Sequence, residues 1–265
     1  HIPAMLEMLG IPYTGSGVLA LALSLDKPMA KKVFAFHGVP TPKFRVFGPG
    51  DQITSEGMTF PLFVKPAHEG SSMGVSPNSV VRDEYELCFQ VDYVRRFYKQ
   101  AALVEEFLEG REFTVGILGN RDPFVLPIRE ILFNRVPKEH GAVYSRQFKV
   151  EFDNEAEFYA CPADLTSDQA NSIKSVALAA FRAIDCRDVG RVDIRLNAAG
   201  LPSVLEINPL PGLTPHFSDL CRAAEVAGIS YEWLVCGILE AAIERYGLSH
   251  LSSRALEFHA LLQTA

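Results

Sequence analysis

Apolar side chains recur along this chain with two periods, one typical of helices and one typical of strands. The clearest helical pattern predicts a helix over residues 166–184, where Thr166 and Gln169 form a capping box at the start. Its apolar positions should form a core face: Ile173, Val176, Ala177, Ala180, Phe181 and Ile184. Further helices are predicted over residues 26–38, 81–99 and 230–246. In the first of these, three apolar residues should share one face: Met29, Val33 and Phe36.

Shorter apolar runs, bounded by glycine, proline or asparagine, predict strands. They cover residues 62–66, 103–108, 112–118, 124–133, 191–197 and 203–208. Helices and strands alternate irregularly, so the sequence predicts an α+β or mixed α/β fold with antiparallel sheets. The polar, irregular segment over residues 135–151 is typical of a loop that covers a site.

Two predicted strands near the C-terminal end place charged residues on one face. In residues 191–197, period-two alternation puts Arg191, Asp193 and Arg195 on the same side of the strand. The opposite side is apolar and should point to the core: Val192, Ile194 and Leu196. The next strand has two polar positions on one face, Glu206 and Asn208, and two apolar positions on the other, Leu205 and Ile207.

A turn centred at residues 199–200 would join these two strands as a hairpin. Asp193 would then lie opposite Glu206, and Arg191 opposite Asn208. Carboxylate and amide oxygens suit a hard cation such as Mg²⁺, and an adjacent arginine can bind a phosphoryl group. A solvated face with cross-strand charge pairs explains the same residues, so both interpretations stay open.

Two lysines lie where a polyphosphate could bind. Lys65 ends a predicted strand just before the glycine-serine loop over residues 68–75, and Lys27 lies in the first turn of a predicted helix. Free backbone N–H groups in such a loop can cradle phosphates. The sequence contains neither a P-loop motif nor a dinucleotide-binding glycine motif after a strand.

Composition narrows the function classes. The 265 residues include 25 lysines and arginines against 32 aspartates and glutamates, a net charge of −7, which argues against bulk binding to nucleic acid or to an anionic membrane. No apolar run reads as a signal peptide or a membrane span. The five cysteines form no Cys-x-x-Cys pair, so buried free thiols in a reducing cytoplasm are expected rather than a disulfide or zinc framework.

Several motifs in a fixed order carry a family resemblance. They are Gly10 to Gly17, Leu25-Asp26-Lys27, Val64-Lys65-Pro66, Glu69 to Gly74, Val104 to Leu108, Glu112-Phe113-Thr114, Cys161-Pro162-Ala163, Arg191-Val192-Asp193 and Glu206 to Gly212. In this order and over nearly the whole chain, the sequence resembles the D-alanine–D-alanine ligases of the ATP-grasp superfamily.

The resemblance implies an ATP-grasp fold, in which two α/β lobes with mainly antiparallel sheets clasp ATP between them. It divides the chain into an N-terminal domain remnant with a connecting helix (1–41), a smaller lobe with a glycine-serine flap (42–108), a larger lobe with the metal site (109–248) and a helical tail (249–265). We expect the tail to pack on its own domain or on a second copy of a homodimer.

The resemblance also assigns eight residues to ATP. Two lysines would contact the phosphates, two serines would form a flap over them and four residues would bind the nucleoside. In that order they are Lys27 and Lys65, Ser71 and Ser72, and Glu105, Glu106, Leu108 and Glu112. Glu105 would accept a hydrogen bond from the adenine amino group, and Glu112 would hold the ribose hydroxyls. The backbone of Glu106 and Leu108 would read the ring edge.

The same resemblance implies the metal ligands and the catalytic residues. Three side chains would bind two Mg²⁺ ions, or Mn²⁺ in their place: Asp193, Glu206 and Asn208. Arg191 would stabilise the transferred phosphoryl group and the tetrahedral intermediate. Ser71 would act from the flap, and Gly212 would border the acceptor site.

The implied reaction joins two D-alanine molecules through an acyl phosphate for peptidoglycan precursor synthesis. In-line phosphoryl transfer needs positioning and charge neutralisation more than a protein nucleophile, which fits these residue types. A ligase that acts by the same mechanism on another amino acid or small carboxylate is the first alternative. A catalytically inactive nucleotide-binding module is the second.

The chain departs from the family pattern at three places. The family usually carries an N-terminal α/β domain with an acidic residue and a histidine near the first D-alanine, and this sequence begins within the last helix of that domain. Gln147 and Phe148 stand where the family shows a Lys-Tyr pair. Phe217 stands at an expected carboxylate-binding serine, with Ser218 one position later and His216, expected to make a structural hydrogen bond, just before. The motifs therefore support the use of ATP and Mg²⁺ more strongly than the specificity for D-alanine.

Overall fold

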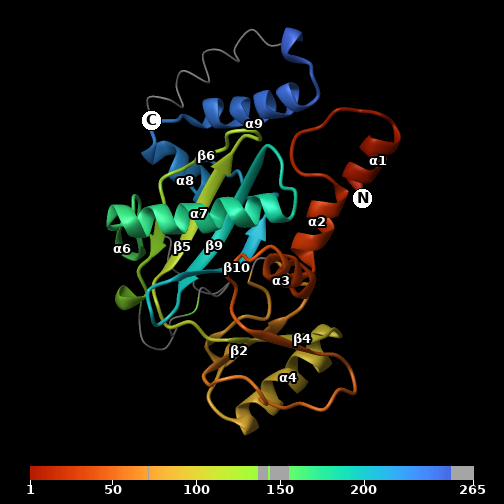
Figure 1. Cartoon of the computed structure of the whole chain (residues 1–265), viewed down its shortest axis with the longest axis vertical. Coiled ribbons are helices and arrows are strands. Elements are labelled where there is room, and N and C mark those ends of the chain that lie inside the picture. The colour runs from red at the N-terminus through yellow and green to blue at the C-terminus, as the bar shows by residue number, and fades with distance from the viewer. Residues whose placement is uncertain (71, 137–142, 144–154, 252–265) are drawn as a thin grey trace.

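The computed structural model describes residues 1–70, 72–136, 143 and 155–251, and these residues form two antiparallel sheets with helices around them (Figure 1). The smaller sheet has four strands in the order β1-β4-β2-β3. Their bounds are Phe44–Phe47 (β1), Leu62–Pro66 (β2), Val80–Val81 (β3) and Ala102–Glu106 (β4). Helix α4 (Glu84–Tyr98) covers one face of this sheet and buries Leu87, Val91 and Val94 against it.

The larger sheet has six strands, with β10, β9, β5, β7 and β8 in a row and β6 paired with β5. Their bounds are Glu112–Leu118 (β5), Phe124–Val125 (β6), Arg129–Ile131 (β7), Tyr159–Ala160 (β8), Val189–Leu196 (β9) and Pro202–Asn208 (β10). All of the pairings within the two sheets are antiparallel, as the sequence predicted. The predicted α+β class with mainly antiparallel sheets is therefore confirmed.

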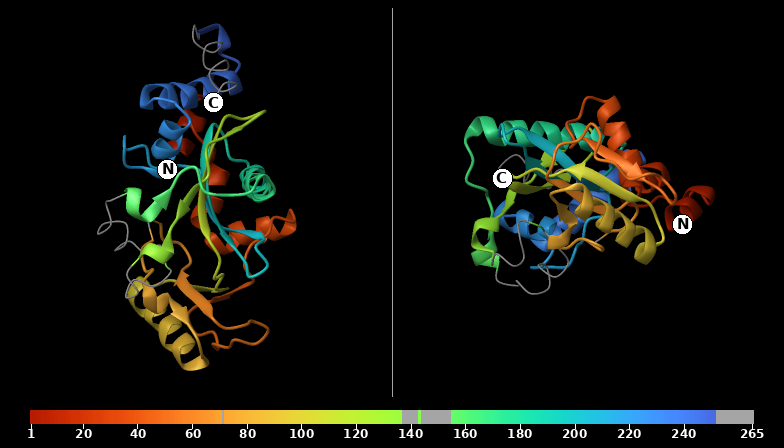
Figure 2. Two further views of the ribbon diagram at one scale, coloured as in Figure 1. Left: turned by 90° about the vertical axis from the view of Figure 1, so that its left-hand side faces the viewer. Right: turned by 90° about the horizontal axis from the view of Figure 1, so that it is seen from below.

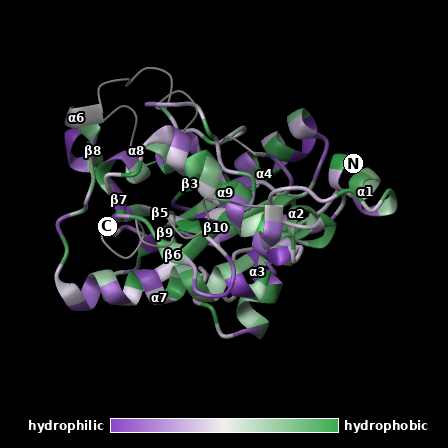
Figure 3. Ribbon diagram, turned by 90° about the horizontal axis from the view of Figure 1, so that it is seen from above, coloured by the Kyte–Doolittle hydropathy of each residue, from purple (hydrophilic) through white to green (hydrophobic). Residues whose placement is uncertain are grey.

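Helices cover both faces of the larger sheet. Helix α7 (Ser167–Ala183) and helix α3 (Lys27–Phe36) pack on one face, and α8 (Asp219–Val226) and α9 (Tyr231–Arg245) form a second core cluster with Leu118, Leu126 and Val189 (Figure 2). Helix α7 carries hydrophilic residues as well as the hydrophobic ones that it buries (Figure 3). Among the described residues no single helix is long and apolar enough to span a membrane, and α8 and α9 pass such a test only together, as a pair bent by 106°.

Shorter elements complete the described chain. They are the helices Ile2–Met8 (α1), Val18–Leu25 (α2) and Glu155–Phe158 (α6), and the 3-10 turns Pro77–Ser79, Phe133–Arg135 and Ser249–Leu251. The predicted loop over 135–151 lies almost wholly outside the described residues, as does the tail after residue 251. The proposed division of the chain into four parts stays a prediction.

The helix predictions succeed where the signal is local. The capping box at the start of α7 is present, with the Gln169 backbone N–H donating to Thr166 Oγ1 at 3.3 Å and the Thr166 N–H donating to Gln169 Oε1 at 3.1 Å. Helices α2 and α8 were missed because both are only eight residues long and lie beside glycine- and proline-rich turns. The Ser218-Asp219 pair at the start of α8 was the available signal.

The predicted face of α3 was right for Val33, which packs against the core of the larger sheet, but wrong for the other two residues. Met29 and Phe36 are exposed, and the helix instead buries Ala30, Lys31 and Phe34. Phe34 joins the core of the larger sheet, while Lys31 forms an ion pair with a carboxylate of the smaller sheet. The Lys31–Glu105 ion pair therefore helps to orient the helix, and the pattern of apolar residues does not predict it.

The cysteines are free thiols, as expected, although not all of them are buried. Cys186 and Cys221 are buried, whereas Cys88 is exposed on α4. Burial raises the pKa of the Cys186 thiol to about 12, which keeps it protonated and unreactive near neutral pH.

Asp188 joins distant parts of the chain just before β9. It is fully buried, and its carboxylate accepts hydrogen bonds from the Gly15 N–H at 2.8 Å, from Asn120 Nδ2 at 2.9 Å and from two nitrogens of Arg245 at 3.0 and 2.8 Å. These contacts hold the N-terminal linker and the end of α9 against the larger sheet.

Replacing Asp188 by asparagine should lower the free energy of unfolding by about 3 kcal/mol, because Arg245 then keeps a largely buried charge without its counterion. Asparagine keeps the side-chain shape and tolerates the positive φ of 64° at this position, so the backbone is not strained. Its NH₂ group would face N–H donors, so the loss includes hydrogen bonds as well as the charge. Urea denaturation measures the effect. The matched control is Asp185→Asn in the exposed Asp185–Arg187 pair, which should change stability by less than about 1 kcal/mol; equal losses in both variants would contradict the assignment.

Candidate active site

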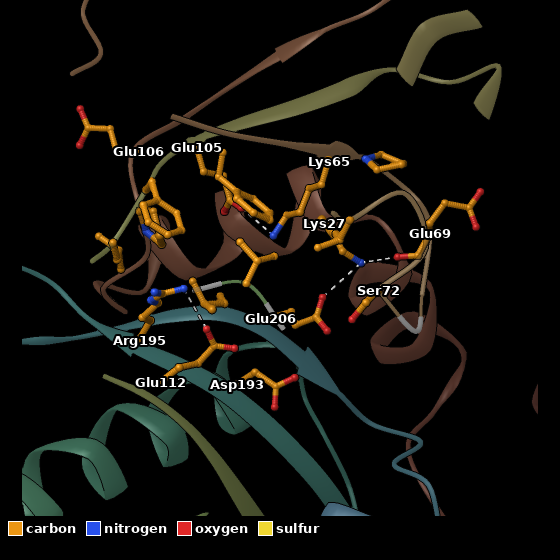
Figure 4. A pocket seen from close by; sticks show the side chains of 18 of the residues that line it. Lys27, Lys65, Glu69, Ser72, Glu105, Glu106, Glu112, Asp193, Arg195 and Glu206 are labelled. Carbon is orange, nitrogen blue, oxygen red and sulfur yellow. Dashed lines mark hydrogen bonds and ion pairs between the residues drawn. The ribbon is translucent and has the colours of Figure 1, made fainter. Parts of the chain in front are cut away.

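A cavity of about 830 Å³, open to solvent, lies between the two sheets (Figure 4). Nine residues singled out from the sequence line it: Lys27, Lys65, Ser72, Glu105, Glu106, Leu108, Glu112, Asp193 and Glu206. Arg191, Asn208 and Gly212 are not among its lining residues, and Ser71, Gln147 and Phe148 lie outside the described part of the chain. Candidate residues from both sheets thus face one space.

The strands β9 and β10 bring the predicted polar residues together. Asp193 pairs with Glu206, and Arg191 pairs with Asn208, as the hairpin prediction required. The register shifts between Val204 and Glu206, so a β-bulge lies at the intervening residue. The predicted pairing is correct at the polar residues, but the strand does not run regularly back to the turn.

This bulge overturns the predicted orientation of Leu205. Regular alternation placed Leu205 on the core side with Ile207, whereas Leu205 is half-buried and lines the cavity next to Glu206. Val204 and Ile207 fill the core instead. A bulge inserts one residue and so lets two consecutive side chains face the same side, which a period-two pattern cannot express.

Each lysine of the cavity is paired with an acid. Lys65 Nζ lies 2.6 Å from Glu105 Oε2, and Lys27 Nζ lies 3.3 Å from Glu206 Oε2 (Figure 4). Lys27 Nζ also donates to the Glu69 backbone oxygen at 2.5 Å, which ties the glycine-serine loop to α3. The protein therefore supplies its own counterions in the cavity, and an anionic ligand would compete with them.

A third lysine, Lys31, supports Glu105 from behind the cavity. It is almost completely buried, forms an ion pair with Glu105 Oε1 and donates to Thr41 Oγ1 at 2.7 Å. Two cations thus share one carboxylate. Burial lowers the pKa of Lys31 to about 8, because the attraction of Glu105 only partly offsets it, while Lys65 keeps a raised pKa through Glu105 and Glu206 despite its own burial. The sequence did not predict the burial of Lys31, because a lysine within a helix is ordinarily exposed to solvent.

The polar face of β9 holds Asp193 in a network. Asp193 Oδ1 accepts from Thr114 Oγ1 at 3.1 Å and from Arg191 Nε at 3.0 Å, and Oδ2 accepts from Arg191 Nη2 at 2.9 Å and from Asn208 Nδ2 at 3.1 Å. Burial raises the pKa of Asp193, and the carboxylate of Glu206 adds to the rise, while Arg191 opposes it. A cation at this position would be electrostatically favoured.

The donor chemistry fits a hard divalent cation. Asn208 uses its NH₂ group toward Asp193, which leaves a carbonyl oxygen as its possible ligand atom. The described residues contain no group of three or more histidine, cysteine, aspartate or glutamate side chains that could hold a metal. Two carboxylates and an amide nevertheless suffice for Mg²⁺, which takes most of its ligands from water and phosphate.

Glu112 and Arg195 lie at the opposite end of the cavity. Arg195 Nη1 lies 3.1 Å from Glu112 Oε2, and Arg195 Nε donates to the Gly110 carbonyl at 3.1 Å. The guanidinium lies 4.6 Å from the centre of the Phe107 ring, which itself stacks with Phe63. This end of the cavity is thus flat, aromatic and fixed in place.

Glu106 differs from its neighbours in the orientation of its side chain. The carboxylate points away from the other labelled groups and accepts from the Thr59 N–H at 3.1 Å (Figure 4). Its backbone, at the end of β4, remains on the cavity side. This arrangement agrees with a role for the backbone rather than for the carboxylate.

The glycine-serine loop makes a tight turn beside Lys65. Ser72 has a φ of 56° and Gly74 a φ of 76°. A Cβ atom on Gly74 would lie 2.5 Å from the Pro66 ring, so only glycine fits there. The close approach holds the loop against the end of β2.

The loop before α8 contains the residues expected near an acceptor. A Cβ on Gly212 would lie 2.7 Å from Ser218 Oγ, which accepts from the Thr214 N–H at 2.9 Å. His216 pairs with Glu225 at 2.8 Å on the surface, in line with the structural hydrogen bond expected of it. Phe217 is exposed, and the Ser218 hydroxyl already accepts a hydrogen bond from the backbone of its own loop.

Comparisons with known proteins agree with this geometry. A family model described as D-ala D-ala ligase C-terminus matches residues 33–240. An uncharacterised protein of Sinorhizobium fredii is 41% identical, with 93% of this chain and 70% of that protein covered, and a D-alanine–D-alanine ligase of Pelotomaculum thermopropionicum is 36% identical, with 93% and 77% covered. The crystal structure of a D-alanine–D-alanine ligase from Bacillus anthracis with ATP superimposes with a TM-score of 0.75 at 27% identity, over 93% of this chain and 75% of that one.

The lowered pKa of Lys31 predicts that the free energy of unfolding depends on pH. The unfolded chain should hold the Lys31 proton up to its ordinary pKa of 10.5, whereas the folded chain releases it near pH 8. Between these values the unfolded state binds more protons, so the Lys31 contribution to the free energy of unfolding rises with pH, by at most about 1.4 kcal/mol per unit. Urea denaturation of the wild type and of Lys31→Met should therefore diverge between pH 8 and 10, and parallel curves would contradict the lowered pKa.

Proposed function

The chain belongs to the D-alanine–D-alanine ligase family, and we propose that it is an ATP-dependent ligase that joins two D-alanine molecules. One observation carries this proposal: lysines from α3 and the smaller sheet and acids from both sheets face a single cavity, an arrangement suited to a nucleotide with its phosphates. The reaction would release ADP and phosphate and serve the synthesis of peptidoglycan precursors in the cytoplasm.

The nucleoside would occupy the flat end of the cavity. Glu105 would accept from the adenine amino group, and Glu112 would bind the ribose hydroxyls. The backbone of Glu106 and Leu108 would read the edge of the ring, which the outward orientation of the Glu106 carboxylate supports.

The phosphates would lie toward the loop and the polar strands. Lys27 and Lys65 would leave Glu206 and Glu105 to bind phosphate oxygens, and the flap with Ser71 and Ser72 would cover them. Lys31 keeps Glu105 partly neutralised after Lys65 has moved, so the exchange does not expose an unpaired buried carboxylate.

Asp193, Glu206 and Asn208 would hold Mg²⁺, or Mn²⁺, in a site for two ions. Bound there, the ions would neutralise charge on the phosphate oxygens. The γ-phosphoryl group would pass from ATP to a carboxylate oxygen of the first D-alanine, with ADP as the leaving group and Arg191 stabilising the charge of the transferred group. The amine of the second D-alanine then attacks the acyl carbon beside Gly212, loses a proton, and displaces phosphate. The flap would keep water from the acyl phosphate.

A different amino acid or small carboxylate is the second candidate substrate. Phe217 is exposed in the loop beside Gly212, where it offers an apolar surface rather than a hydroxyl to an incoming acceptor. In either case the substrate is a small amino acid or a similar carboxylate, and the enzyme would act as a homodimer with the four-part organisation expected from its sequence.

Incubation of the full gene product with ATP, Mg²⁺ and D-alanine should give ADP, phosphate and D-alanyl-D-alanine in equal amounts, as measured by mass spectrometry. A panel of other amino acids separates the two candidate substrates by the mass of the dipeptide. ATP binding without turnover of any panel member would favour an inactive binding module and would contradict the ligase assignment.

Replacing Glu206 by glutamine should lower kcat by about 100-fold and weaken the apparent affinity for Mg²⁺, because a carboxylate ligand becomes a neutral amide. Initial rates over a Mg²⁺ titration measure both effects. Glu244→Gln, the same change on the exposed side of α9, is the matched control and should leave both values unchanged. Unaltered kinetics in Glu206→Gln would remove this residue from the site.

A further inference from the structure

Arg191 is held by two carboxylates rather than one. Its Nε and Nη2 atoms bind the two oxygens of Asp193 at 3.0 and 2.9 Å, and its Nη1 atom lies 3.4 Å from Asp219 Oδ2. Asp193 belongs to the same strand, while Asp219 is the first residue of α8. The guanidinium is therefore fixed from two independent elements.

Asp219 is itself held in place. Its other oxygen, Oδ1, forms an ion pair with Arg129 Nη1 from β7, and both side chains are largely buried. The Arg129 guanidinium lies 3.7 Å from the centre of the Tyr159 ring in β8, close enough for a cation–π contact. The position of Asp219 in the first turn of α8 also favours a negative charge. Arg129 thus neutralises Asp219 and leaves its second oxygen directed at Arg191.

The carboxylates of Asp193 and Asp219 have different roles under the proposed function. Asp193 faces Glu206 across the hairpin and would be a ligand of Mg²⁺, so the ion and the guanidinium would compete for the same oxygens. The contact between Arg191 and Asp193 would weaken when the metal and ATP arrive, which is when Arg191 must be aligned. Asp219 lies on α8 and has no part in that ligand set.

We propose that Asp219, held by Arg129, is a positioning residue that keeps Arg191 aligned while Asp193 serves the metal. This inference rests on the proposed function. A purely structural role, in which the Arg129–Asp219 pair only docks α8 on the sheet, makes different predictions. It would affect stability without changing the behaviour of Arg191 on metal binding.

The first test observes Arg191 directly by ¹⁵N NMR of its Nε–H group, assigned with Arg191→Lys. In the wild type the signal should persist both in metal-free protein and after addition of Mg²⁺ and ADP. In Asp219→Asn it should persist in metal-free protein, where Asp193 still holds the guanidinium, and broaden or vanish when Mg²⁺ and ADP are added. A signal that persists in both states of Asp219→Asn overturns the inference.

The second test separates kcat from KM. Asp219→Asn should lower kcat by about 10- to 100-fold and change the KM for ATP by less than about threefold, because the nucleotide contacts remain. Since Arg129 would then lose its ion pair with Asp219, the double variant Arg129→Gln/Asp219→Asn provides a neutral pair and should show the same loss of kcat. Asp188→Asn is the matched control: it disrupts a buried arginine–aspartate pair away from the cavity and should lower stability while kcat is retained.

The outcomes distinguish the two proposals. A wild-type protein that binds neither Mg²⁺ with ADP nor the substrates overturns the proposed function and this inference with it. A wild-type ligase whose Asp219→Asn variant keeps its kcat, or loses no more than Asp188→Asn, overturns the positioning role alone.

Discussion

The requirement that buried charges be neutralised determines how the two sheets meet. Lys31 and Lys27 both lie on α3, yet the first pairs with Glu105 of the smaller sheet and the second with Glu206 of the larger one. Removing Glu105 from the fully buried Lys31–Glu105 pair would leave Lys31 without its carboxylate at low dielectric, which costs several kcal/mol. Helix α3 thus connects the two sheets through the same acids that face the cavity, so the ion pairs that hold the structure together also define the site.

This coupling makes ligand binding an exchange of partners rather than an addition of charge. In the described structure Lys27 and Lys65 bind carboxylates that would contact the nucleotide or the metal in the proposed complex. Phosphates would take the lysines while a divalent cation and the adenine amino group would take the acids, so each buried charge keeps a partner. In the proposed complex Lys31 would stay on Glu105 while Lys65 leaves it, and Asp219 would stay on Arg191 while Asp193 binds the metal.

The sequence predicted the features whose signals are local. The capping box of α7, the strand β2 and the pairing of Asp193 with Glu206 all follow from short-range patterns. Contacts between residues far apart in the chain could not be predicted from the sequence. The ion pair between Arg129 and Asp219 joins positions 90 residues apart, and Lys31 reads as a solvated helix residue until Glu105 is brought against it. The expected roles of the site residues rest on the family resemblance of several motifs in a fixed order, because no single motif indicates them.

The bulge at Leu205 explains how one hairpin serves both the core and the cavity. A regular strand gives alternate residues to each side, so the polar face of β10 would have only every second position. With one residue added, Leu205 and Glu206 both reach the cavity while Val204 and Ile207 remain in the core. An apolar side chain and a carboxylate can then stand next to each other at the site, one suited to a base and the other to a cation. The irregularity that a period-two pattern cannot predict is thus what allows β10 to present both an apolar side chain and a carboxylate to the cavity.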